Sequence, residues 1–350
     1  MAVTAAILIF LPSKERFKVQ DEFALIRSWL SRRPTPDRHI EVDIGDDAAV
    51  VQPLSGNSMV LTCDTMVETV HFRRDTLSFK EIGRKLLAVN ASDINAMGGV
   101  PVYALISASV PDGWQEDELL QIYEGLYAYA EEIKVALIGG DTTRTDGPLT
   151  LTLTLTGEVE KGRALRRSAA KPGDILFVTG TLGDSAAGLD LLLKNRAASD
   201  GEKLLIEAHR RPDPPLQIGP WLSDSPFYSR VSLNDISDGL AREAWEIAEA
   251  SGVKIVIEED KIPLSPALLS YAESSGQDPY QWVWSGGEDF QLLGTVPFQH
   301  WEAFEWEAKR RNWKIAAIGQ VESGEPGVEK IVDKQRLKVE KSGYNHFANR

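Results

Sequence analysis

Short aspartate motifs recur along almost the whole chain, and most stand beside an apolar segment or a glycine turn. An aspartate at the end of a strand is where α/β proteins bind their ligands. A chain with this pattern is therefore expected to fold around sheets whose strand ends gather carboxylates. The motifs are Gly45-Asp46-Asp47, Thr62-Cys63-Asp64, Asn90 to Asp93, Gly140-Asp141, Gly183-Asp184, Asp235 to Asp238 and Glu288-Asp289.

Taken singly, most of these aspartates have an ordinary structural explanation, such as a solvated turn or a helix cap. Asn90 and Asp93 differ, because they are expected on a helix face shared with Leu86 and Met97. Burying a carboxylate on such a face costs several kcal/mol unless it is paired or bound to a metal. Taken together, the motifs indicate hard cations such as Mg²⁺.

The composition excludes several classes of protein. The formal net charge is -14, whereas a nucleic-acid surface needs a basic stripe. Bound cations would offset this acidic balance. A single cysteine, Cys63, excludes an intramolecular disulfide framework and a multi-cysteine zinc site, and it makes the cytoplasm the expected compartment.

The first residues are apolar from Ala2 to Leu11. This stretch is too short to span a bilayer and lacks the basic residues that open a secretory signal. We interpret residues 1–20 as an extension or the result of a misassigned start codon, with a weak signal peptide as the alternative. No later stretch reaches membrane length without charges, so no membrane association is expected.

Apolar periodicity predicts alternating strands and helices in both halves, which indicates an α/β (α+β) fold of two domains. A turn cluster at residues 170–174 favours a domain boundary nearby, with an N-terminal domain over residues 21–165 and a C-terminal domain over 166–350. Strict Leu/Thr alternation makes 149–156 a strand with one buried face. The other expected strands are 50–61, 103–110, 175–179 and 253–257, and the expected helices are 21–30, 119–133, 182–193 and 301–311.

The chain lacks both the P-loop pattern and the Gly-x-Gly-x-x-Gly dinucleotide pattern. Its aspartate motifs, in their order, resemble those of the thiamine-monophosphate kinases. The superfamily of these enzymes includes aminoimidazole ribonucleotide synthetase and selenophosphate synthetase. The resemblance runs from about Glu22 to Phe347. It implies an N-terminal domain that dimerises through its sheet, a C-terminal α/β domain, and ATP with several Mg²⁺ ions between them.

The implied activity is ATP-dependent phosphorylation of thiamine monophosphate to thiamine diphosphate by a homodimer. Asp64, Asp93 and Arg167 are favoured for catalysis, although no residue is identified as a general base. The implied metal ligands are Asp47, Thr62, Asp64, Asp93, Asp141, Asp235 and Asp238. The implied nucleotide contacts are Tyr123, Gly140, Asp141, Arg167 and Ser237. The implied substrate contacts are His71, Glu288 and Tyr344.

Several of these residues suit the chemistry, and each also has a structural explanation. Arg167 can fork onto phosphate oxygens, or it can belong to a solvated basic loop. His71 can donate to the substrate near pH 7, although lone histidines are often structural. Tyr344 can stack on a cationic ring or pack in a core. The family usually carries a hydroxyl residue where this chain has Cys63, which puts a metal contact there in doubt.

Other members of the superfamily are less consistent with the sequence. Selenophosphate synthetase needs a reactive cysteine or selenocysteine in a glycine-rich N-terminal segment, and the hydrogenase-maturation carbamoyl dehydratase needs a C-terminal cysteine. Aminoimidazole ribonucleotide synthetase stays possible on fold alone, but Ser285 to Asp289 and the Gly343 to Phe347 tail favour the thiamine enzyme. A non-catalytic nucleotide-binding scaffold is the alternative from another class. The full set of carboxylate motifs argues against it.

Overall fold

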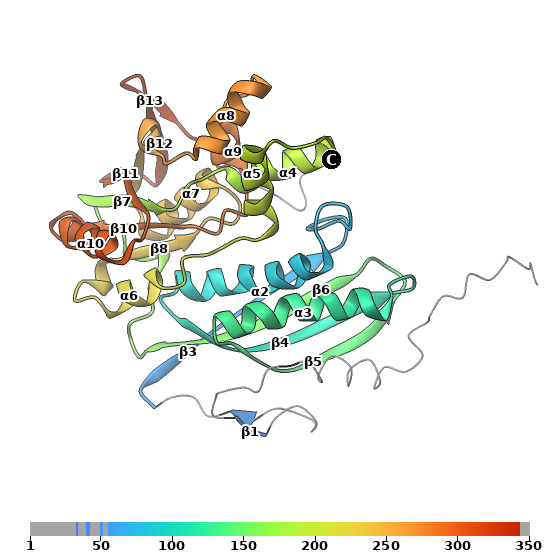
Figure 1. The fold of residues 1–350 in the computed structure, drawn as a ribbon. Coiled ribbons are helices and arrows are strands. Elements are labelled where there is room, and N and C mark those ends of the chain that lie inside the picture. Colours follow the sequence, from blue (N-terminus) through green and yellow to red (C-terminus); the bar gives the residue numbers. More distant parts are fainter. Residues whose placement is uncertain (1–32, 34–39, 43–49, 52–54, 344–350) are drawn as a thin grey trace, which may run out of the picture.

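The computed structural model describes residues 33, 40–42, 50–51 and 55–343. An N-terminal sheet domain lies below a larger C-terminal domain in Figure 1. The helix α2 (Phe79–Ala96) lies between them, on the side of the N-terminal sheet that faces the C-terminal domain. This position lets α2 contribute side chains to the interface of the two domains.

The N-terminal domain is built on a four-stranded sheet of order β3-β6-β4-β5. Helices α2 and α3 (Glu116–Glu132) cover one of its faces. The strand β6 buries its leucines against these helices and turns its threonines to the other face. The strands are β3 (Asn57–Val67), β4 (Val100–Pro111), β5 (Ala136–Thr145) and β6 (Thr150–Glu160), and a separate pair is formed by β1 (Ile40–Val42) and β2 (Val50–Val51).

Two glycines let α2 and α3 touch backbone to backbone. A β-carbon at Gly83 would overlap the carbonyl group of Ile122, and one at Gly125 would overlap that of Lys80. Larger residues at either position would push the helices apart. Because α2 also carries Asp93, this contact helps to position a candidate site residue.

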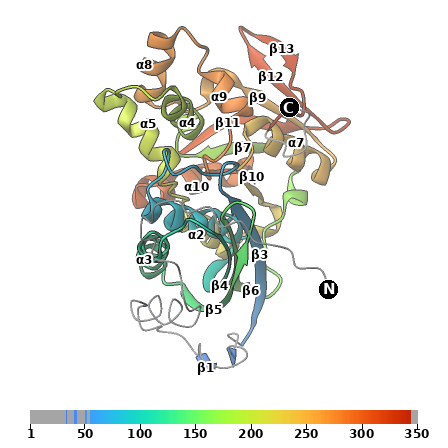
Figure 2. The same cartoon turned by 90° about the vertical axis from the view of Figure 1, so that its right-hand side faces the viewer.

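The C-terminal domain has a seven-stranded sheet of order β13-β12-β9-β11-β7-β10-β8. Its strands are β7 (Asp174–Thr179), β8 (Ser232–Asp235), β9 (Lys254–Glu258), β10 (Leu292–Pro297), β11 (Ile315–Glu322), β12 (Gly327–Val332) and β13 (Gln335–Lys338). Its α-helices are α4 (Asp184–Lys194), α5 (Asp200–Arg210), α6 (Ile218–Asp224), α7 (Leu240–Ser251), α8 (Pro266–Ser275), α9 (Tyr280–Ser285) and α10 (Phe298–Arg311). Short 3₁₀ helices are η1 (Arg167–Ala169), η2 (Tyr228–Arg230) and η3 (Glu259–Lys261). Figure 2 shows α4, α5 and α8 on one side of this domain and α7 on the other.

The expected α/β fold with two domains is confirmed, and most predicted elements lie within one to a few residues of the observed ones. The strand predicted over 50–61 is wrong as a single element, since Val50–Val51 and Asn57–Val67 are strands of different sheets. A turn at Ser55 and Gly56, where Gly56 has φ +91°, precedes the second strand.

Two other expectations are not settled by the structure. The helix predicted over 21–30 lies outside the described residues, and the domain limits at residues 165 and 166 stay a prediction. Among the described helices, none combines the length and the apolar character needed to cross a bilayer.

Candidate active site

Three carboxylates from three separate elements meet where the two domains face each other. They are Asp64 on β3, Asp93 on α2 and Asp235 at the end of β8. Hydrogen bonds join these elements, because Thr62 on β3 donates to Asp93 and Ser92 on α2 donates to Asp235. Asp64 was expected at the end of a strand, but β3 continues to Val67, so that expectation is wrong.

The helix α2 organises this carboxylate cluster, which we define as Asp64, Asp93 and Asp235. Thr62 Oγ1 donates to Asp93 Oδ2 at 2.5 Å, and Asn90 Oδ1 accepts from the backbone N of Asp64 at 3.1 Å. Ser92 Oγ donates to Asp235 Oδ2 at 2.8 Å across the domain interface. One helical turn therefore contacts both the backbone of Asp64 and the carboxylate of Asp235. The helix-face expectation for Asn90 and Asp93 agrees with this placement.

The carboxylate cluster contains three acidic groups and no basic group that would balance their negative charge. Burial raises the pKa of Asp64 to about 7, and the charge of Asp93 adds to the effect. Burial and then Asp93 likewise raise the pKa of Asp235 to about 7. Burial also raises the pKa of Asp93, against the hydrogen bond from Thr62 and the charge of Arg167. Such a group of oxygen ligands needs positive charge, which suits a hard cation.

The described part of the chain contains no group of three or more acidic, histidine or cysteine side chains arranged to hold a metal ion unaided. Mg²⁺ usually takes one or two carboxylates and completes its octahedral shell with water and substrate phosphates. The cluster therefore fits Mg²⁺ delivered with a phosphorylated ligand. It does not resemble a closed, all-protein metal cage.

Arg167 stands beside the carboxylate cluster and is half-exposed. Its Nε donates to Asn234 Oδ1 at 2.8 Å, and its Nη1 lies 2.9 Å from Glu246 Oε2. Burial raises the pKa of both Asp93 and Asp235, and the charge of Arg167 opposes part of this rise. The arginine is thus held at the site by partners on the C-terminal domain.

Glu243 is a site residue that sequence reasoning missed. Its Oε2 accepts from Asn234 Nδ2 at 2.5 Å, and its Oε1 accepts from Ser237 Oγ at 3.3 Å and from the backbone N of Asp238 at 3.2 Å. Burial, followed by the charge of Asp235, raises its pKa to about 8. Glu243 therefore stabilises the conformation of the segment from Asn234 to Asp238 through these three hydrogen bonds. Its position in the first turn of α7, just after this motif, is the signal that could have identified it.

Glu288 lies on a loop that contacts the same segment. Its backbone has φ +66°, an uncommon value for a side chain with a β-carbon, and its N donates to the carbonyl of Ser237 at 2.7 Å. Its Oε2 accepts from Lys85 Nζ at 2.9 Å and lies 3.2 Å from His209 Nδ1. Lys85 and His209 were also missed. A lysine between Ile82 and Val89 on an apolar helix face is the signal for the first.

Asp141 and Cys63 do not join the carboxylate cluster within this chain. Asp141 pairs with Ser107 on β4, which pairs with Thr152 on β6, which in turn pairs with Thr65 on β3. Directly opposed residues share a face, so Asp141 lies with Thr65 on the face away from the helices. Cys63 shares that face, where it contacts Thr154 Oγ1 at 3.7 Å, whereas Asp64 points to the helix side.

Gly140 is exposed on β5, whereas Tyr123 is buried in the core of the N-terminal domain. A β-carbon at Gly140 would overlap the carbonyl of Ile106 on the neighbouring strand, so strand packing explains this glycine. Tyr123 is buried between the helices and the sheet, beside Tyr127. Core packing accounts for its place in this structure.

The remaining predicted contacts are placed only in part. His71 follows β3, and its Nδ1 accepts from the backbone N of Val67 at 3.0 Å. Asp47 and Tyr344 lie outside the described residues.

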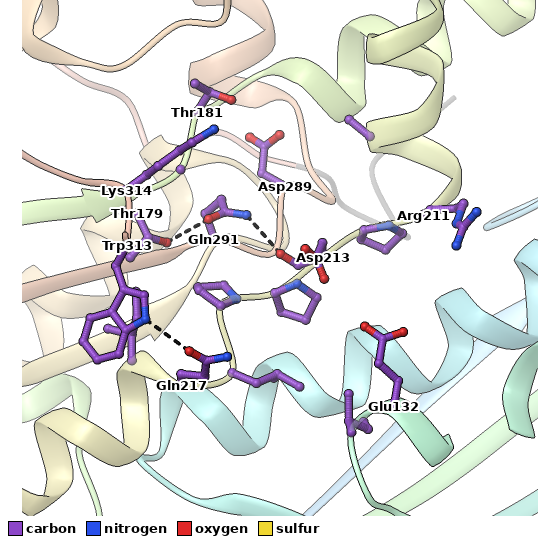
Figure 3. Close-up of a pocket in the computed structure, with 18 of the residues that line it drawn as sticks. Glu132, Thr179, Thr181, Arg211, Asp213, Gln217, Asp289, Gln291, Trp313 and Lys314 are labelled. Atoms are coloured by element: carbon purple, nitrogen blue, oxygen red, sulfur yellow. Dashed lines mark hydrogen bonds between the residues drawn. The ribbon is translucent and has the colours of Figure 1, made fainter. Parts of the chain in front are cut away.

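A separate cavity of about 930 Å³ opens between the domains, and its lining includes none of the three clustered carboxylates. Figure 3 shows Gln291 beside Thr179 and Trp313 beside Gln217, with Asp289 and Lys314 on the upper wall. Asp289 accepts from the backbone N of Gly183 at 2.8 Å and of Ser185 at 3.4 Å. The Asp289 side chain thus caps the start of α4 and joins the Glu288-Asp289 motif to the Gly183-Asp184 motif. This cap is a structural role for Asp289.

Known proteins resemble this chain over nearly its whole length. The family of AIR synthase related protein N-terminal domains matches residues 45–159, and that of the C-terminal domains matches residues 171–331. Thiamine-monophosphate kinase of Bacillus subtilis is 43% identical over 331 residues, which are 93% of this chain and 99% of that protein.

Solved structures agree. Thiamine-monophosphate kinase from Stenotrophomonas maltophilia is 33% identical, with a TM-score of 0.77 over 90% of this chain and 96% of its own. The structure of AaThiL complexed with AMPPCP and TMP is 35% identical, with a TM-score of 0.74 over 93% of this chain and 96% of its own. On this evidence the chain belongs to the thiamine-monophosphate kinase family.

Proposed function

We propose that this chain transfers the γ-phosphoryl group of ATP to thiamine monophosphate, which yields thiamine diphosphate and ADP. The observation that carries the proposal is the meeting of Asp64, Asp93 and Asp235 beside Arg167 at the domain interface. The relatives named thiamine-monophosphate kinase and the AaThiL complex with AMPPCP and TMP support the choice of the two substrates.

Bound Mg²⁺ ions would neutralise the phosphates of both substrates and stabilise the charge that develops during transfer. Within the described residues, Asp64, Asp93 and Asp235 are the ligands that we propose, because their charges need a cation. Thr62 donates to Asp93 and so orients its carboxylate. Asp238 follows Asp235 on the segment that Glu243 holds, and Asp47 is a further proposed ligand outside the described residues.

The chain needs no general base for this reaction. The acceptor is a phosphate monoester with a charge of about -1.5 to -2 at pH 7, so its attacking oxygen is already ionised. The main obstacle is repulsion between this anion and ATP. Arg167, held by Asn234 and Glu246, is proposed to donate to phosphate oxygens and to fix their orientation. Ser237, on the neighbouring segment, is a proposed nucleotide contact, as are Gly140 and Tyr123.

We assign the thiamine end of the substrate to the neighbourhood of Glu288. Its side chain is 29% exposed, and its Oε1 makes no hydrogen bond within the described residues. An ionised carboxylate oxygen that is open to a ligand suits a cationic thiazolium ring or an amine donor. His71 and Tyr344 are the other proposed substrate contacts.

The enzyme is proposed to act as a homodimer in the cytoplasm. The sheet face away from α2 and α3 exposes Met59 by 48%, Leu61 by 65% and Leu105 by 42%. Such an apolar face on a sheet is typical of an interface. Asp141 lies on this face, so a second copy of the chain covering it would give Asp141 a place near an interface site.

The test is an assay of purified protein with ATP, Mg²⁺ and thiamine monophosphate, in which thiamine diphosphate and ADP are both quantified. Equal amounts of the two products support the proposal. ADP formation that does not depend on the acceptor, or no reaction by well-folded protein, contradicts it. Omission of Mg²⁺ should abolish both products.

A further inference from the structure

Lys85 is a buried charge whose only described partners lie in the other domain. It is 1% exposed on α2, among the apolar residues Ile82, Leu86 and Val89. Its Nζ donates to Glu288 Oε2 at 2.9 Å and to the carbonyl of His209 at 3.1 Å. A buried ammonium group is costly unless it is paired, and hydrophobic replacements often serve stability as well or better. A role beyond stability is therefore indicated.

His209 supports the same carboxylate from a third element. It is 2% exposed at the end of α5, with its Nδ1 3.2 Å from Glu288 Oε2 and 3.3 Å from Ser185 Oγ. Burial and then the charge of Lys85 lower its pKa, so the ring is neutral near pH 7. Both partners engage Oε2, so Oε1 makes no hydrogen bond within the described residues, and the Glu288 side chain is 29% exposed.

We propose that Lys85 is a positioning residue that fixes the Glu288 carboxylate for the thiamine end of the substrate, with His209 as its second support. The inference rests on the proposed function. One N-terminal helix would then hold both ends of the acceptor, because α2 also carries Asp93. Lys85 and Asp93 are about 12 Å apart along the helix, at about 1.5 Å per residue. That separation is of the same order as the length of the extended substrate.

The charge balance around Glu288 agrees with this role. Burial alone would raise its pKa, but the charge of Lys85, followed by the bond to His209, lowers it to about 2. The other charged neighbours are Asp289, next to it on the loop, and Arg210, which follows His209 on α5. Without Lys85, burial would still oppose ionisation, and of the two partners only His209 would favour it. The pKa of Glu288 should therefore rise, so that the acidic end of the pH range protonates more of the carboxylate.

The experiment compares the wild type with Lys85→Met from about pH 6 to about pH 9, and measures kcat and the KM for each substrate. We expect the KM for thiamine monophosphate to rise about tenfold at the alkaline end, which is about 1.4 kcal/mol. The rise should be larger at the acidic end. The KM for ATP should stay within about twofold. Ratios of variant to wild type at each pH remove the titration of the substrate's own phosphate.

Arg84→Met is the matched control, because Arg84 precedes Lys85 on the same helix. Its guanidinium lies 3.7 Å from Asp213 of the other domain and 3.5 Å from Glu132, and it does not touch Glu288. This variant loses an interdomain ion pair, yet the KM for thiamine monophosphate should change by less than about twofold. His209→Gln alters the second support of the Glu288 carboxylate. We expect it to raise the KM for thiamine monophosphate about threefold.

Several outcomes would overturn the inference. An unchanged KM for thiamine monophosphate in folded Lys85→Met would do so, as would an equal rise for both substrates or the same rise in Arg84→Met. If Lys85→Met does not fold, His209→Gln is tested in its place, and an unchanged KM for thiamine monophosphate in that variant overturns the inference. A wild type that does not phosphorylate thiamine monophosphate overturns the proposed function and the inference together. An active wild type with an unaffected variant overturns the inference alone.

Discussion

Two groups of aspartates in this molecule are buried or half-buried, yet their surroundings differ. Asp64, Asp93 and Asp235 lie near one another, and beyond the effect of burial the charge of Asp93 opposes ionisation of Asp64 and Asp235. Asp289 instead accepts from two backbone N–H groups at the start of α4.

The second group consists of Asp184 and Asp289. Asp184 accepts from the hydroxyl groups of Thr181 and Ser265. Burial raises the pKa values in both groups, to about 7 for Asp64 and to about 8 for Asp289. A raised pKa therefore does not by itself identify a functional acid. The distinguishing feature is the number of donors that the chain supplies. Asp184 and Asp289 each accept from two groups, whereas Asp93 and Asp235 each accept from one hydroxyl group, which leaves more of their charge for a bound cation.

The largest expected effect comes from removing a carboxylate of the first group or the neighbouring carboxylate of Asp238. Asp64→Ala, Asp93→Ala and Asp238→Ala should each lower kcat about 10³-fold or more, because the charge on the transferring phosphoryl group would lose its stabilisation. The fold should persist, since Asp93→Ala also removes repulsion from Asp64 and Asp235. Steady-state kinetics and circular dichroism test this. Near-normal turnover in all three variants would refute the metal-cluster model.

Cation binding gives the next largest effect. At a concentration of about 100 times Kd, a ligand that binds only the folded state stabilises it by about 2.7 kcal/mol. Mg²⁺ with a non-hydrolysable ATP analogue should therefore raise the Tm of the wild type and have little effect on Asp93→Ala. Asp289→Ala is the control, and its Tm should shift as much as that of the wild type. Equal shifts in Asp93→Ala and the wild type would show that the cluster does not bind the cation.

The comparison also shows what the sequence could and could not predict. Local periodicity was sufficient for β6, where alternating leucine and threonine residues agree with the buried and exposed faces. It was also sufficient for α3 and α10. The helix position of Asp93 followed from its spacing to Asn90. These features depend on residues close together in the chain, so short patterns reveal them.

Strand order and face are properties of the whole sheet, and the motifs do not contain them. Asp141 stands in a short aspartate motif as Asp64 does, but its pairing through Ser107 and Thr152 places it on the opposite face of the sheet from Asp64. The pairing of Lys85 with Glu288 joins residues more than half the chain apart. Neither could be predicted without knowing which elements meet.

Arg167→Lys is expected to have a smaller effect than loss of a carboxylate. Lysine keeps the charge but lacks the planar fork that reaches Asn234 and phosphate oxygens together. We expect kcat/KM for ATP to fall by about 10- to 30-fold, or about 1.4 to 2 kcal/mol. Arg166→Lys is the neighbouring control on the same basic run and should be close to the wild type. A loss in Arg166→Lys as large as that in Arg167→Lys would contradict a specific role for Arg167.

The smallest effect tests the second group directly. Asp289→Ala removes the acceptor for the N–H groups of Gly183 and Ser185, and loss of such a cap costs about 1 to 2 kcal/mol. The free energy of unfolding, measured with urea, should fall by that amount, while kcat stays within a few-fold of the wild type. Asp93→Ala should behave in the opposite way, with unfolding little changed and kcat nearly lost. If Asp289→Ala instead lost turnover without loss of stability, the cap explanation would be wrong. The raised pKa of Asp289 would then belong to an acid of the reaction.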